Sequence, residues 1–439
     1  MTNEQKVIVL TGFSHFITHG FMTLLPAVLV VIAAEHSMSF LDIGIIANIG
    51  YFLYGLGSFP SGYLADRFGS KRILTVGIFG MAISSILVGL SPGAASFTVA
   101  YGLLGIFASI HHPAGLSLIA RRVITARGKA LGLHGVMGNV GLFLTPMAAA
   151  LSVFLFHTWR AAYLIFGIIG IGFAVVLYRA RVEEEPDLCV KNLFAWFRKP
   201  MRTKGGRVEP EAEVNSPARG DEAAGTDAVS IIPIALLVLF IGSILSGFIF
   251  RGSLTFFPAL LQREVYFITS SDEPVVLAGF VTTAVLSLGL VGSWFGGYLN
   301  DKIKVPELFP VIIFFLVAPA LYGMSRLTDS GLLAASCFFS LVYYAWQPAQ
   351  NFLIAKYTKK ASQGMGFGIN FFLIFGMGSI ATAIGGYVAD DYGVDRFYGI
   401  MAFVAFCAML VAIVVYASKR YQMRFTWKLV KETKEDLKK

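Results

Sequence analysis

Hydrophobic residues occur along this chain in uncharged runs of about twenty, long enough to cross a hydrocarbon core of roughly 30 Å as an α-helix. Segments of about ten residues that alternate between apolar and polar, the pattern of a membrane β-barrel, do not occur in the sequence. The pattern predicts an all-α membrane protein with about twelve transmembrane helices. The predicted spans are roughly residues 7–33, 41–62, 73–92, 97–119, 130–156, 161–179, 231–261, 275–298, 308–325, 331–355, 363–388 and 397–418.

The order of residues in the first half of the chain recurs in the second half. Residues 62–67, Gly-Tyr-Leu-Ala-Asp-Arg, close the second span and return as residues 297–302, Gly-Tyr-Leu-Asn-Asp-Lys, at the end of the eighth. At the same offset, residues 112–120 and 347–355 share Pro-Ala and Leu-Ile-Ala. A repeat of this kind predicts two pseudo-symmetric bundles of six helices in the same orientation, with the substrate site near the bilayer midplane between them.

Four parts of the chain are expected from this organisation. They are an N-terminal six-helix bundle over residues 1–180, a linker over 181–229, a C-terminal six-helix bundle over 230–418 and a tail over 419–439. The linker is rich in Glu, Arg, Gly and Pro, so it cannot bury enough apolar surface to fold as a domain. The first span is longer than the core of a signal peptide, and we expect it to be retained.

Basic residues between the spans indicate the orientation of the chain. The positive-inside rule places both termini in the cytoplasm, in the plasma membrane or the bacterial inner membrane. The residues that set this orientation are Arg67, Lys71, Arg72, Arg121, Arg122, Arg127, Lys129, Lys356, Lys359 and Lys360.

Composition excludes several other classes of function. Of the 439 residues, 56% are hydrophobic and 14% are charged, whereas roughly a quarter of a soluble domain is charged. The net charge of +9 comes from short clusters between spans and not from one basic face, so nucleic-acid binding is not expected. Cys189, Cys337 and Cys407 have no metal-ligand spacing. No paired carboxylates or Ser/His/Asp set occurs, so we expect neither an enzyme nor a cofactor or metal site.

The segment from Gly62 to Arg72 resembles the signature that the major facilitator superfamily carries between its second and third spans. Within that superfamily, the chain is similar to the fosmidomycin-resistance group. The residues that carry this narrower resemblance are His112-Pro113 in span four, Gly138-Asn139-Val140-Gly141 before Pro146 in span five, and Gly376-Met377-Gly378 in span eleven. The resemblance implies a transporter of two six-helix halves that work by alternating access.

The resemblance also implies that the loop after the second span latches the two halves together on the cytoplasmic side. Glycines permit a tight turn and a carboxylate can interact with a helix amino terminus, whereas positive-inside anchoring alone explains only the basic residues. The predicted latch residues are Gly62, Asp66, Arg67, Gly69, Lys71, Arg72 and Asp301. The second copy has Lys304 in place of Gly69, which weakens the role of Asp301.

Two positions depart from the pattern of proton-coupled members of the superfamily. Span four lacks the membrane arginine that many of them carry, and Thr145 stands where the antiporter-associated motif has glycine. The sequence therefore leaves antiport, symport and uniport open.

Arg251 is the clearest candidate for substrate binding. When the first span is aligned with the seventh, three residues out of step with the rest of the repeat, Arg251 falls opposite His19 near mid-span. An ionisable residue at that depth is costly, so it indicates function. A guanidinium there could hold a carboxylate, phosphate or phosphonate through paired hydrogen bonds. Snorkelling to the interface and a structural ion pair are the alternatives.

Histidines form a second group of candidates. His15 and His19 lie four residues apart on one helical face. His111 and His112 are adjacent, so at most one is expected to face a cavity, and His112 is preferred because it aligns with Gln347. The candidates for proton coupling are His15, His19 and His134, since histidine titrates near neutral pH, although a single membrane histidine is more often a hydrogen-bonded packing residue than a proton carrier.

A polar stripe in span ten completes the predicted site. The predicted substrate-binding residues are Arg251, His19, His15, His112, Tyr344, Gln347 and Asn351. No Asp or Glu lies deep in a predicted span, which favours an anionic substrate over a cationic drug or sodium coupling. We expect a monomer in contact with membrane lipids that moves a small organic anion, linked to protons. Efflux of amphipathic compounds, a lipid flippase and a channel remain alternatives.

Overall fold

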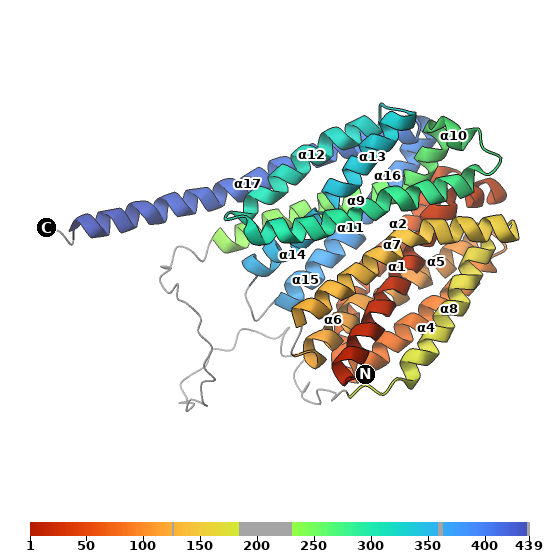
Figure 1. Ribbon diagram of the computed structural model, residues 1–439, viewed down its shortest axis with the longest axis horizontal. Helices are drawn as coiled ribbons and strands as arrows, with labels where there is room; N and C mark the ends of the chain where they lie inside the picture. Colours follow the sequence, from red (N-terminus) through yellow and green to blue (C-terminus); the bar gives the residue numbers. More distant parts are fainter. Residues whose placement is uncertain (125–126, 184–230, 359–362, 437–439) are drawn as a thin grey trace.

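The computed structural model describes residues 1–124, 127–183, 231–358 and 363–436, and these residues form helices with no β-strand (Figure 1). The first half of the chain contains α1 (Asn3–His36), α2 (Phe40–Leu56), α3 (Ser58–Phe68), α4 (Ser70–Gly89), α5 (Ala94–Ala108), α6 (His111–Arg122), α7 (Arg127–Phe156) and α8 (Arg160–Arg179). The predicted linker, residues 181–229, lies outside the described residues apart from residues 181–183.

The second half begins with α9 (Ile231–Glu264) and ends with a helix that projects beyond the bundle (Figure 1). Its other elements are α10 (Tyr266–Thr269), α11 (Pro274–Lys302), the 3₁₀-helix η3 (Pro306–Leu308), α12 (Phe309–Met324), α13 (Asp329–Tyr343), α14 (Trp346–Tyr357), α15 (Gln363–Phe371), the π-helix η5 (Phe372–Gly376), the 3₁₀-helix η6 (Met377–Ser379), α16 (Ile380–Asp391) and α17 (Val394–Asp436). The backbone of α17 continues through most of the predicted tail.

Eleven segments of the described chain are long and apolar enough to cross a membrane. The predicted span at 331–355 is not among them, and it is divided into α13 and α14, each shorter than a full crossing. Together the two helices supply the twelfth crossing. The prediction of an all-α protein with about twelve spans is confirmed.

The repeat extends to the way in which two spans are broken. Pro113 and Pro348 lie in the first turns of α6 and α14, where a missing N–H is tolerated. Proline has no N–H to donate to the backbone carbonyl four residues earlier. In each half, a serine of a neighbouring helix donates to that carbonyl instead. Ser58 Oγ lies 3.5 Å from the Ser109 carbonyl, and Ser293 Oγ lies 3.1 Å from the Tyr344 carbonyl. Ser58 and Ser293 are equivalent positions in the two copies of the repeat. The sequence pattern alone did not identify them as part of it.

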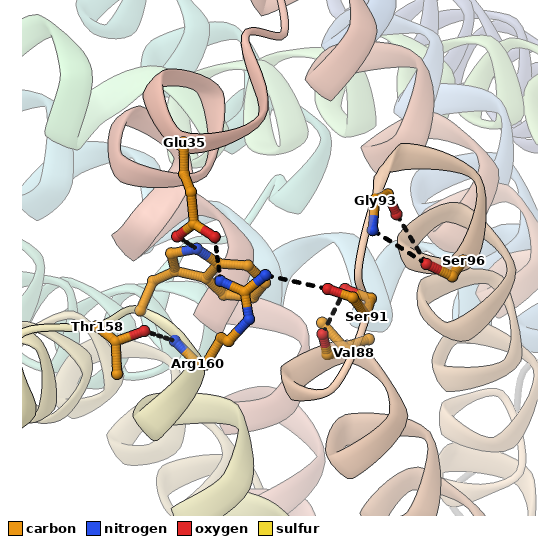
Figure 2. A network of polar contacts seen from close by, with 8 residues as sticks. Glu35, Val88, Ser91, Gly93, Ser96, Thr158 and Arg160 are labelled. Carbon is orange, nitrogen blue, oxygen red and sulfur yellow. Dashed lines mark hydrogen bonds and ion pairs between the residues drawn. The ribbon is translucent and has the colours of Figure 1, made fainter.

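The two ends of the bundle are named by the helix termini that lie there. The linker end is where α1 begins and α8 ends; the opposite end is where α1 ends and α8 begins. At the opposite end of the first half, Glu35 accepts hydrogen bonds from Trp159 Nε1, at 2.6 Å, and from the Arg160 guanidinium. Arg160 also donates to the Ser91 carbonyl at 3.1 Å (Figure 2). This network joins α1, α8 and the turn after α4.

The two halves meet closely at the opposite end through α2 and α16. The Asp390 carboxylate of α16 accepts from the backbone N–H groups of Phe40 and Leu41, at 2.9 and 2.8 Å, and so caps α2 from the other half. The Thr382 hydroxyl donates to the Gly44 carbonyl at 2.8 Å. A Cβ on Gly44 would lie 2.2 Å from the Thr382 carbonyl oxygen, so only glycine permits this approach.

A second contact between the halves joins α7 to α11. The Met147 N–H donates to Thr283 Oγ1 at 3.0 Å, and a Cβ on Gly279 would lie 2.8 Å from the Pro146 carbonyl oxygen. The halves are thus held together at the opposite end by backbone-level contacts.

Candidate functional site

A small cavity of about 60 Å³ lies between the two halves. Three of its lining residues come from α1 and α7, and the others come from the second half. They are His19, Asn139, Leu142, Ser246, Phe250, Tyr343, Tyr344, Trp346, Gln347, Gln350, Asn351, Phe371, Ile374 and Phe375. Among the predicted substrate-binding residues, His19, Tyr344, Gln347 and Asn351 line this space, whereas Arg251, His15 and His112 lie outside its lining.

Arg251 is buried where the halves meet, with 3% of its surface exposed. Its guanidinium carbon lies 4.0 Å from the ring centroid of Tyr51 and 4.9 Å from that of Phe375. The rings of Phe250 and Tyr54 follow at 5.3 and 5.7 Å. These rings come from α2, α9 and η5, so aromatic faces of both halves surround the cation. The side chain therefore does not reach a membrane interface.

Arg251 has no carboxylate partner among the described residues, and its Nε is enclosed without a hydrogen-bond acceptor. Aromatic faces stabilise a cation but accept no strong hydrogen bond, so the donors of the guanidinium stay unmatched. The cavity wall begins at its neighbours Phe250 and Phe375. The described residues therefore leave an unneutralised cation directly behind the cavity wall.

Four histidines of the first half gather behind His19: His15, His111, His112 and His134. His15 Nδ1 donates to the His134 carbonyl at 2.7 Å, and His15 Nε2 lies 3.0 Å from His19 Nε2. His111 Nδ1 lies 2.9 Å from Ser14 Oγ. The structure brings both residues of the His111-His112 pair into this group, and neither lines the cavity. The sequence had not indicated that His111 takes part.

Neighbouring residues fit around the histidines. A Cβ on Gly138 would lie 2.3 Å from the His15 ring, so the glycine-rich segment of span five makes room for that imidazole. The His112 ring stacks on Phe371 and Phe375 of the second half, with centroids 5.0 and 5.8 Å apart. His112 thus joins the histidine group to the cavity wall across the boundary between halves.

The second half supplies a buried hydrogen-bond network that sequence reasoning missed. Trp346 Nε1 donates to Ser246 Oγ at 3.0 Å, and the Tyr343 hydroxyl donates to the Ser246 carbonyl at 2.7 Å. Gln350 Nε2 donates to Ser243 Oγ at 3.0 Å. These bonds fix one wall of the cavity. Position in the repeat could have pointed to Trp346, which aligns with His111.

A buried carboxylate at the linker end was also missed, because Glu307 lies one residue before its predicted span. Glu307 accepts hydrogen bonds from Lys356 Nζ at 2.7 Å and from the Tyr357 hydroxyl at 2.6 Å. The pair ties the last turn of α14 to η3, and neither Glu307 nor Lys356 lines the cavity. It stabilises the second half, and it does not neutralise Arg251.

Part of the predicted latch is described. Gly69 turns the chain between α3 and α4 with a φ of +94°, which favours glycine. Lys71 Nζ donates to the Tyr178 carbonyl at 3.0 Å, and Arg67 donates to the Tyr63 hydroxyl at 2.9 Å. These bonds stay within the first half. The Asp66 and Asp301 side chains lie outside the described ones, Gly62 lies within α3, and Arg72 lies in the first turn of α4.

Comparison with known proteins gives a consistent family match. The family model described as Major Facilitator Superfamily matches residues 11–383. The chain is 23% identical to the D-galactonate transporter of Escherichia coli O6:H1, over 82% of this chain and 84% of that one. It is 23% identical to the fosmidomycin resistance protein of Escherichia coli K12, over 91% and 90%. It is also 23% identical to a probable hexose phosphate transport protein of Chlamydia pneumoniae, over 91% and 87%.

Among solved structures, the chain is similar to a bacterial homolog of the human lysosomal transporter Spinster in an inward-facing, unoccupied conformation. The TM-score is 0.68 with 14% sequence identity, over 95% of this chain and 96% of that one. At this identity the likeness concerns the fold.

Proposed function

Because the chain belongs to the Major Facilitator Superfamily, we propose that it is a secondary transporter that moves a small organic anion across the membrane by alternating access. The substrate is of the carboxylate, phosphate or phosphonate type. Two relatives are named for D-galactonate and for hexose phosphate, which are anions of this type, and this supports the proposal.

The observation that carries the proposal is the unpaired Arg251. A buried cation is costly unless a partner or water compensates it, and the described neighbours of Arg251 are aromatic rings. An anionic substrate supplies the missing charge, and its carboxylate or phosphoryl oxygens accept the guanidinium hydrogen bonds. His19, Gln347 and Asn351 offer further hydrogen bonds from the cavity wall.

The contacts between the halves are compatible with transport by alternating access. Residues 1–180 and 230–418 act as the two moving bundles, joined by the linker 181–229 and followed by the tail 419–439. We assign the linker end to the cytoplasm, because the basic residues cluster there. The conformation described here is closed at the opposite end by α2 and α16, so its cavity serves the cytoplasmic side. The protein acts as a monomer among membrane lipids.

The proposal is tested by a thermal-stabilisation screen followed by transport in proteoliposomes. D-galactonate, a hexose phosphate and fosmidomycin are the probes, chosen from the relatives. Saturable uptake or exchange of one such anion is expected, and acceleration by an imposed pH gradient is expected if protons are coupled. Stabilisation by none of the organic anions, together with no transport of them, would contradict the proposal.

Efflux of amphipathic compounds is the second candidate, and the aromatic lining of the cavity favours it. Phe250, Tyr343, Tyr344, Phe371 and Phe375 present apolar faces. Stabilisation by many unrelated lipophiles would indicate this function. Movement of lipid without solute would indicate a flippase, and non-saturating conductance would indicate a channel.

His19 is proposed to take part in proton coupling, with His15 and His134 behind it. Because His19 lines the cavity and contacts His15, its charge responds to both the substrate and the cluster. His19→Gln should reduce accumulation driven by a pH gradient by about tenfold, while exchange at equal pH falls by less than about threefold, since glutamine hydrogen-bonds but does not titrate. Equal losses in both assays would assign His19 to binding or packing.

The latch role of Asp66 is proposed from the family signature. Asp66→Asn removes the charge that favours a helix amino terminus when the linker end closes. We expect slower transport, by roughly tenfold, and greater access of a thiol reagent to the linker-end mouth, with unchanged membrane insertion. Asp272→Asn, an exposed position before α11, is the control. Transport and access equal to those of the parent would remove the latch role.

A further inference from the structure

Four histidines from three helices of the first half converge on one point. They are His15 of α1, His111 and His112 at the start of α6, and His134 of α7. Each offers one ring nitrogen, and these four nitrogens lie within 4.8 Å of one another. All four side chains are buried, with exposed fractions between 1% and 7%. The sequence separates them widely, so only the fold assembles this cluster.

The hydrogen bonds of the cluster leave one ring nitrogen of His15 and one of His111 free to act as ligands. His15 Nδ1 must carry a proton to donate to the His134 carbonyl, so the neutral ring keeps a lone pair on Nε2. His111 Nδ1 is bonded to Ser14 Oγ, which leaves Nε2 as its free nitrogen. Metal-ligating histidines usually bond a carbonyl or hydroxyl through the other nitrogen in this way.

Unpartnered nitrogens give a second, independent observation. Within the described part of the chain, His111 Nε2, His112 Nε2 and both ring nitrogens of His134 are enclosed without a hydrogen-bond partner. Buried polar atoms are normally satisfied, so a cluster that served only for packing would leave several exceptions in one place. A ligand that accepts several nitrogen lone pairs at once resolves them together.

We propose that this four-histidine cluster binds one transition-metal dication of the Zn²⁺, Co²⁺, Ni²⁺ and Cu²⁺ class. Imidazole nitrogens suit these ions, whereas Mg²⁺ and Ca²⁺ require oxygen ligands. Tetrahedral coordination with bonds of about 2.0–2.1 Å places ligand nitrogens about 3.3 Å apart. Because the rings of His15, His111 and His134 are stacked in this structure, they turn toward the ion and also close by up to about 1.5 Å when it binds.

His19 gives the ion a path from the cavity. It lines the cavity, and its Nε2 lies 3.0 Å from His15 Nε2, the nitrogen that must bind the metal. An entering ion takes the place of His19 at that nitrogen. His112 moves at the same time, and its ring stacks on Phe371 and Phe375. Metal binding in the first half is thereby connected to the wall that the second half contributes.

The test uses the full-length chain, purified without a polyhistidine tag and treated with a chelator. Co²⁺ is titrated and its visible absorption recorded, because tetrahedral Co²⁺ absorbs far more strongly than the octahedral aqua ion. We expect one Co²⁺ per chain with a tetrahedral spectrum, displaced by Zn²⁺ and not by Mg²⁺ or Ca²⁺. Binding should weaken as the pH falls, because the rings must be neutral to coordinate.

Matched variants distinguish this cluster from surface histidines. His111→Gln and His134→Gln should each weaken Co²⁺ binding by at least tenfold, whereas His157→Gln, at an exposed position, should bind like the parent. Size-exclusion profiles confirm that each variant is folded. A parent protein without stoichiometric binding, an octahedral spectrum, or equal binding by His111→Gln and the parent would each overturn the proposal. None of these results depends on anion transport.

Discussion

Arg251→Gln is expected to weaken substrate binding by roughly 10- to 100-fold, with a smaller loss in expression. Hydrogen bonds to a charged group contribute about 1.5–3 kcal/mol, and each 1.4 kcal/mol is a factor of ten in affinity. Arg251→Lys keeps the charge and loses the planar fork, so its affinity should fall between those of Arg251→Gln and the parent. Both are measured by titration calorimetry with the anion that the stabilisation screen identifies.

Arg263→Gln is the matched control, because Arg263 lies on the same helix, α9, with its side chain 56% exposed. It should bind the anion like the parent. An Arg251→Gln protein that binds and transports the anion normally would contradict the anion site and leave the family assignment intact. An Arg251→Gln protein that is more stable than the parent would fit the cost of burying a cation. That result alone does not show whether Arg251 binds the anion.

The fold followed from the sequence because membrane insertion imposes a strong and local constraint. Every backbone group in the bilayer needs an internal partner, so apolar runs of sufficient length must become helices. The repeat of Gly62–Arg67 at residues 297–302 then indicated two halves of the same kind. The fold class and the two halves could be predicted from these two features, whereas the family and the transporter class followed from the resemblance of Gly62–Arg72 to the family signature.

The division of spans was less predictable, because it depends on partners outside each span. Pro348 alone is compatible with a kinked continuous helix. The break between α13 and α14 is stable because Ser293 of α11 bonds the freed Tyr344 carbonyl. Hydropathy carries no information about a hydrogen bond from another helix, so span ten was predicted as one segment.

The candidate site was predicted only where a single helix carries the information. The spacing of His15 and His19 along α1 is visible in the sequence, whereas the approach of His111 and His134 depends on packing between helices. Arg251 was found through the cost of a charge within a span. The aromatic rings around Arg251 were not predicted, because Tyr51, for example, belongs to the other half of the chain.

The role of α2 and α16 in closing the opposite end can be tested by adding one methyl group at Gly44. Gly44 of α2 faces α16, and a Cβ there would lie 2.2 Å from the Thr382 carbonyl oxygen, a backbone atom that cannot rotate away. Gly44→Ala therefore separates α2 from α16. Overpacking typically costs about 1–3 kcal/mol, which corresponds to roughly a 5- to 150-fold shift away from the closed arrangement.

Distances between spin labels on exposed ends of the two halves measure this shift. The labels are placed by His157→Cys and Ser270→Cys in a chain from which the three native cysteines have been removed. We expect Gly44→Ala to populate longer distances and Gly172→Ala, where a Cβ meets nothing within 4 Å, to leave the distribution unchanged. Unchanged distances in Gly44→Ala would mean that α2 and α16 do not hold the opposite end closed. Neither substitution changes Asp390, Phe40 or Leu41, so a difference between the two variants originates at the steric contact of Gly44 with α16.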